Sequence, residues 1–159
     1  MSTVTSHRFS LPGPASPLEG VSADAWQRLI APLETQPTGA ISESGALGAS
    51  GIFPRRLVEL GYATNMRRED DGKRQVCDFV LPWTQSRFLA DPIAQYTVLA
   101  KSMRAYYDAL RDGEIVKPKE MSIAGALAVL HVGGLGALKA WPKLFDNTQS
   151  LYDATQGAF

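Results

Sequence analysis

The stretch between Asp91 and Gly113 limits most strongly what this chain can fold into. Asp91 can cap a helix, and Pro92 behind it suits a first helical position. Apolar and aromatic side chains then recur every three or four residues, at Ile93, Tyr96, Leu99, Met103, Tyr107 and Leu110. This spacing predicts an amphipathic helix that Gly113 ends. Its stripe is typical of a protein core rather than of a cofactor site.

An earlier helix is predicted to begin after Ser22, which is a suitable N-cap. Trp26 and Leu33 belong to its apolar face. Pro32 removes a backbone hydrogen bond and clashes with the preceding turn, so we expect a kink there or a helix that ends near Glu34.

Other segments are shorter. A loop is predicted over 36–50, a charged hairpin-like loop over 65–75 and a short strand over 76–81. Helices are predicted over 54–60, 122–132, 135–141 and 150–155. The sequence therefore predicts a mainly α fold with a small β or loop excursion.

Composition narrows the possible functions. The 159 residues suffice for one domain with a core, and the 16 basic and 16 acidic side chains cancel. A neutral chain has no electrostatic attraction for nucleic acid, so no nucleic-acid partner is expected. Cys77 is the single cysteine, which excludes an intrachain disulfide and a cysteine zinc site. His7 and His131 are too few for a histidine metal cluster, and no cofactor or metal is predicted.

The two ends of the chain differ in character. Residues 1–21 are rich in Pro, Gly and Ser and are predicted to form an arm, whereas 22–159 are predicted to form the folded domain. The start lacks the layout of a signal peptide, so synthesis and folding in a cytoplasm are expected. We find no apolar run near the ~18 residues that span a bilayer and expect no membrane span.

Three segments stand apart from helix packing. Glu34-Thr35 closes the first helix, a glycine-rich segment runs over 42–54, and a second one runs over 128–141. A carboxyl group can deliver a proton to a glycosidic oxygen if partial burial raises its pKa. Glycines let a backbone approach a sugar closely. These residue types would suit chemistry on a glycan, which the resemblance of the three segments to a known family implies.

These segments resemble the soluble lytic transglycosylases, the goose-type lysozymes and, most nearly, phage tail lysozymes. Glu34-Thr35 takes the place of the Glu-Ser of that family. The positions that match the two glycine-bearing segments include Ser42, Gly45, Gly48 and Gly133. His131 stands where phage-tail members often carry His, whereas Gly51 replaces the family's substrate-holding Gln.

The resemblance implies a lysozyme-like fold over about 22–157 and cleavage of peptidoglycan glycan strands. Glu34 is the expected catalytic acid. The residues expected to bind substrate are Ser42, Gly45, Gly48, Gly51, His131, Gly133 and Tyr152. A transglycosylase needs no second carboxylate, because the substrate's own hydroxyl attacks. Glu43 is the only nearby carboxylate that a hydrolase would use.

The resemblance also implies a setting and leaves an alternative open. The expected setting is a phage tail or related particle that acts on the periplasmic cell wall, with arm 1–21 docking to tail or hub proteins. The alternative is a catalytically degenerate lysozyme-like domain that serves as a structural tail or hub component. A helical adaptor without any glycan link is a third hypothesis, which the three matching segments disfavour.

Overall fold

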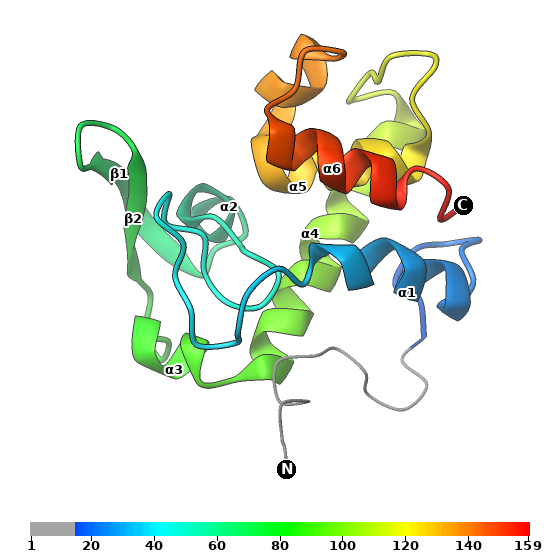
Figure 1. Cartoon of the computed structure of the whole chain (residues 1–159). Coiled ribbons are helices and arrows are strands. Elements are labelled where there is room, and N and C mark those ends of the chain that lie inside the picture. The colour runs from blue at the N-terminus through cyan, green and yellow to red at the C-terminus, as the bar shows by residue number, and fades with distance from the viewer. Residues whose placement is uncertain (1–14) are drawn as a thin grey trace. The chain divides into compact units, whose positions relative to one another are not determined.

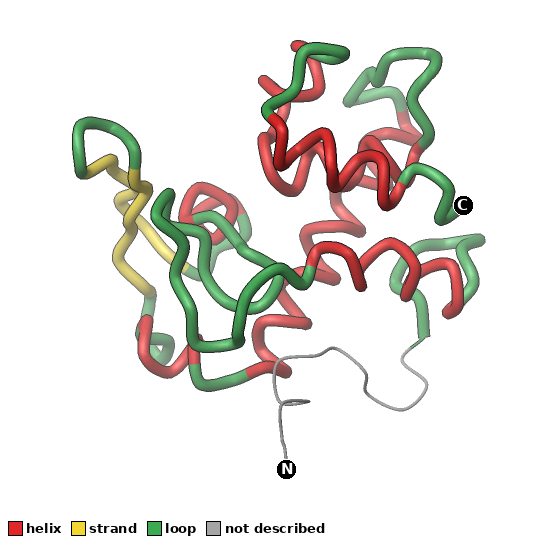
Figure 2. Tube along the Cα trace, in the orientation of Figure 1, coloured by secondary structure: helices red, strands yellow, loops and turns green. Residues whose placement is uncertain are grey.

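The computed structural model describes residues 15–159, so the predicted arm lies largely outside the described residues (Figure 1). Contacts divide these residues into two compact units. Unit 1 is Glu34–Lys101, and unit 2 combines 15–33 with Ser102–Phe159. Helices dominate the described chain and the only named sheet in it has two strands, which confirms the mainly α prediction (Figure 2).

Unit 1 begins with the loop that precedes α2 (Pro54–Glu59). Pro54 takes the first position of α2, and Gly61 follows it with a φ of 86°, as the sequence predicts. The segment 65–75 belongs to a hairpin as predicted, but most of it is strand and not loop, because β1 (Ala63–Glu69) and β2 (Arg74–Phe79) pair there antiparallel. β1 is mostly exposed, so it lacks the apolar alternation that would have identified it.

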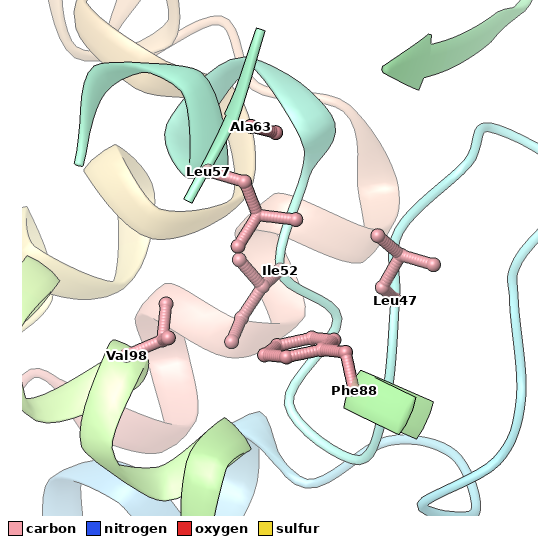
Figure 3. Packing of buried hydrophobic residues seen from close by; sticks show 6 residues of the cluster. All are labelled: Leu47, Ile52, Leu57, Ala63, Phe88 and Val98. Atoms are coloured by element: carbon pink, nitrogen blue, oxygen red, sulfur yellow. The ribbon is translucent and has the colours of Figure 1, made fainter. Parts of the chain in front are cut away.

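The core of unit 1 gathers apolar side chains from five segments (Figure 3). They come from the loop before α2, from α2, from β1, from α3 (Gln85–Leu89) and from α4 (Pro92–Asp112). The six buried members are Leu47, Ile52, Leu57, Ala63, Phe88 and Val98. Helix α3 escaped prediction because five residues are too few to show a helical period, although Thr84 caps it by accepting the Arg87 N–H at 3.1 Å.

Helix α4 follows the predicted bounds, and its buried face differs from the predicted one. Asp91 accepts the N–H of Ala94 at 3.0 Å as a cap. Leu99 and Met103 are buried as expected, but Ile93 is 63% exposed. Gln95, two residues further on, is fully buried instead. A polar residue can take a core position only where the surrounding backbone satisfies its amide, and the sequence does not display those partners.

Unit 2 contains α1 (Ala23–Ile30), a 3₁₀ turn (Ala31–Leu33), α5 (Ile123–Ala140) and α6 (Asp146–Thr155). Ser22 caps α1 as predicted, accepting the N–H of Ala25 at 3.1 Å. The 3₁₀ turn contains Pro32, so the α-helix ends before Glu34 as expected. Helix α6 begins four residues earlier than the predicted start at 150.

Helix α5 is interrupted at Gly134, where φ is 67° and ψ is −164°. The break confirms the predicted end at Gly133–Gly134 and the separate segment that follows. Over its full length, however, α5 has the 18 residues and the mean hydropathy of 1.6 that a membrane span would have. Ile123–Ala140 is thus an apolar stretch of the length that the sequence was predicted to lack. About 56% of that window is buried in the structure, as in the core helix of many folded proteins.

Candidate functional site around Glu34 and the glycine-rich loop

Glu34 lies directly after the 3₁₀ turn, at the start of unit 1. Its side chain is half-buried, and its Oε1 atom is shielded from solvent. The position is therefore the one predicted, at the close of the first helical segment. A carboxyl group that is partly withdrawn from water and still reachable is suited to exchange a proton with a bound molecule.

Residues 35–36, directly after Glu34, are hydrogen-bonded at several points to the glycine-rich loop, which comprises residues 37–50. The N–H of Thr35 donates to the Ala49 carbonyl at 2.9 Å. The side-chain amide of Gln36 donates to the carbonyls of Gly48 at 2.8 Å and Ala46 at 3.0 Å. These bonds make Glu34 and the loop parts of one local structure, which the sequence segments alone did not show.

Ser42 acts within this loop. Its hydroxyl accepts the N–H of Ala46 at 2.9 Å, and its own N–H donates to the Ala46 carbonyl at 2.9 Å. Leu47 and Ile52 pair in both directions, at 2.8 Å and 2.9 Å. The structure thus gives the Ser42 hydroxyl a role in closing the turn at 42–46.

Gly45 and Gly48 both adopt a positive φ, of 96° and 79°. A Cβ on Gly45 would lie 2.1 Å from the Gln75 carbonyl oxygen, and one on Gly48 would lie 2.3 Å from Oε1 of Gln95. A sugar was predicted to approach the backbone closely at these two glycines. In the structure, Gln75 and Gln95 of the same chain occupy that space instead. At Gly51, with a φ of 63°, an added Cβ would meet only Ala46, at 3.5 Å.

Gln95 is the residue that sequence reasoning missed. Its amide nitrogen donates to the carbonyls of Thr38 at 2.9 Å and Phe88 at 3.0 Å. Its amide oxygen accepts the N–H of Ala49 at 3.0 Å. All three polar positions of the amide are thus used. The sequence contains one signal of its burial. Gln95 stands four positions before Leu99, and this spacing places it on the apolar face of α4.

The remaining predicted site residues belong to unit 2. His131 is buried in α5, and exposed Gly133 precedes the break at Gly134. Tyr152 in α6 is 7% exposed, and its ring fills the space beside Gly125, where a Cβ would lie 2.4 Å from Cε1. Packing between α5 and α6 therefore accounts for Tyr152. Of the eight predicted residues, Glu34, Ser42, Gly45, Gly48 and Gly51 are grouped in unit 1.

Unit 1 also contains a cavity of about 190 Å³ between the loop and β2. Its lining residues are Ile41, Gly45, Leu47, Pro54, Arg74, Gln75, Val76, Cys77 and Gln85. Burial, with the charge of Asp78 as a smaller cause, raises the pKa of the Cys77 thiol, and Arg67 opposes the shift. The thiol is therefore protonated at neutral pH. Within 15–159, no cluster of His, Cys, Asp and Glu side chains could hold a metal ion.

Comparison with family models, curated proteins and solved structures finds no match to this chain. The resemblance to lysozyme-like proteins therefore rests on its three sequence segments alone.

Proposed function

We propose that this chain is a lysozyme-like protein that cleaves peptidoglycan glycan strands, with Glu34 as its catalytic acid. The arrangement of Glu34 carries the proposal. This half-buried acid ends a helical segment, and Thr35 behind it is hydrogen-bonded to the glycine-rich loop. The proposed setting is a phage tail or virion that acts on the cell wall, with residues 1–21 docking to tail or hub proteins.

The chemistry requires one acidic proton. The Glu34 carboxyl donates its proton to the glycosidic oxygen, and the bond between that oxygen and the anomeric carbon breaks. In a transglycosylase, a hydroxyl of the same sugar forms the new bond and returns its proton to Glu34. In a hydrolase, water takes the place of that hydroxyl. Only hydrolysis creates a new reducing end, so the products distinguish the two reactions.

The test compares the wild-type chain with Glu34→Gln on purified peptidoglycan. We expect Glu34→Gln to slow the loss of turbidity at least about 100-fold, because a positioned general acid contributes that much. Glu69→Gln is the matched control, since Glu69 is an exposed carboxylate of β1 in unit 1 to which neither reaction assigns a role. It should keep wild-type activity. Equal activity of Glu34→Gln and wild type would refute the role of Glu34.

The second candidate is a catalytically degenerate lysozyme-like domain that serves as a structural tail or hub component. Two observations favour it. Gly51 replaces the Gln with which the family holds its substrate. The space beside Gly45 and Gly48, where a sugar was expected, is also occupied by Gln75 and Gln95 of the chain itself. If wild type and both variants are equally inert on peptidoglycan, this function replaces the first, and assembly of the chain into a particle becomes the measurement.

A further inference from the structure

We propose that Gln95 is a positioning residue, which fixes the glycine-rich loop and through it the segment that begins at Glu34. The proposal rests on the proposed function for its catalytic consequence. That Gln95 fixes the loop is a separate claim about unit 1, and it is supported by the contacts of the buried Gln95 amide.

The amide of Gln95 connects three segments that are distant in sequence. It receives the N–H of Ala49 and donates to the carbonyls of Thr38 and Phe88, all within 3.0 Å. Thr38 and Ala49 belong to opposite ends of the loop, and Phe88 belongs to α3. One side chain of α4 therefore fixes both ends of the loop.

Ala49 carries this contact onward to Glu34. Its N–H is held by Gln95, while its carbonyl receives the N–H of Thr35 at 2.9 Å and that of Gln36 at 3.4 Å. Both polar groups of a single peptide residue are thus used, one toward α4 and one toward the segment after Glu34. A shift of Ala49 would move Thr35, and the Glu34 backbone is bonded covalently to Thr35.

The site is built for an amide of this length. Two carbonyls require two donors and the Ala49 N–H requires an acceptor, and among side chains only Asn and Gln supply both without charge. Gly48 leaves the space that the amide occupies, since any Cβ there would lie 2.3 Å from its oxygen. Gln95→Glu keeps the size of the side chain and replaces the two donors by an acceptor that faces two carbonyls.

The experiment follows amide hydrogen exchange by NMR in the full chain for wild type, Gln95→Glu and a control, Gln85→Glu. The control makes the same chemical change at an exposed residue of unit 1. In Gln95→Glu, we expect the amides of Ala49 and Thr35 to exchange about tenfold faster, the effect of losing one buried hydrogen bond. The amide of Leu127, which is buried in unit 2, should keep its rate.

A second measurement separates positioning from general support. If the chain cleaves peptidoglycan, Gln95→Glu should lower kcat with little change in KM, because a displaced acid affects the reaction more than binding. Unchanged exchange at Ala49 and Thr35, an equal acceleration at Leu127, or faster loop exchange with an unchanged kcat would each overturn the proposal. If wild type is inert, the proposed function fails, and the exchange rates still decide whether Gln95 holds the loop.

Discussion

Single glycines determine how closely the segments of unit 1 approach one another. Gly45 and Gly61 have similar positive φ angles, of 96° and 86°. They differ in surroundings, since an added Cβ meets the Gln75 backbone at Gly45 and meets nothing within 4 Å at Gly61. This pair separates the cost of a left-handed backbone from the cost of a steric clash.

Gly45→Ala is expected to destabilise the chain by about 3 kcal/mol, because backbone strain of about 1–2 kcal/mol adds to overpacking. Gly61→Ala should show only the strain. Urea denaturation of the two variants measures both free energies of unfolding. Equal losses would mean that Gln75 does not approach Gly45 as closely as the structure shows.

At the scale of elements, the β1–β2 hairpin is held by charges as well as by backbone pairing. Asp78 on β2 accepts hydrogen bonds from Asn65 at 2.9 Å and from Arg67 at 3.1 Å. These two bonds, with the charge of Arg67, hold the pKa of the Asp78 carboxyl below its usual value. Because the folded pKa is the lower one, this support is present above the ordinary carboxyl pKa and is lost as the pH falls through the lowered value.

Arg67→Gln should therefore move the titration midpoint of Asp78 upward, toward the ordinary aspartate value, in an NMR titration of the carboxyl carbon. Arg68→Gln is the control, since Arg68 is on the same strand and donates to the Gly72 carbonyl instead. An unchanged midpoint in Arg67→Gln would show that the lowered pKa of Asp78 has another origin.

The interrupted shape of helix α5 requires a glycine at position 134. Its φ of 67° and ψ of −164° fall in a region that is essentially open to glycine alone. Gly134→Ala should destabilise the chain by about 1–3 kcal/mol. Gly136→Ala, at an exposed position with free space around it, should be neutral or stabilise by up to about 1 kcal/mol. Thermal or urea unfolding checks the pair, and a Gly134→Ala chain as stable as Gly136→Ala would count against the break.

The elements that the sequence predicted well are those with local signals. Ser22 and Asp91 as caps, Pro54 as a first helical residue and the break at Gly134 each depend on neighbouring residues only. Gln95 could not be predicted, because its partners come from residues far away in sequence. Likewise, the sequence predicted Glu34 and the loop as separate segments. It did not predict the hydrogen bonds from Thr35 and Gln36 that join them.

At the scale of the whole molecule, the charge balance determines how the proposed binding to a cell wall would respond to salt. The 16 basic and 16 acidic side chains give no net attraction to anionic polymers. If the chain binds peptidoglycan through sugars, binding should therefore depend little on ionic strength.

Co-sedimentation with purified peptidoglycan should change less than about twofold between 0.05 M and 0.5 M salt, a range over which exposed charges become strongly screened. An unrelated basic protein of similar size serves as the control and should be released. Loss of this chain at high salt would indicate ionic adsorption instead of recognition of sugars.

The turn of the hairpin has a practical use in such work. Asp70, Asp71 and Gly72 all have positive φ and are exposed, and Gly72 has no neighbour within 4 Å of an added Cβ. Exposed turns of this kind tolerate insertions well. A short epitope placed after Asp71 would allow antibodies to locate the intact chain in a particle or on a cell wall, with both termini left as they are.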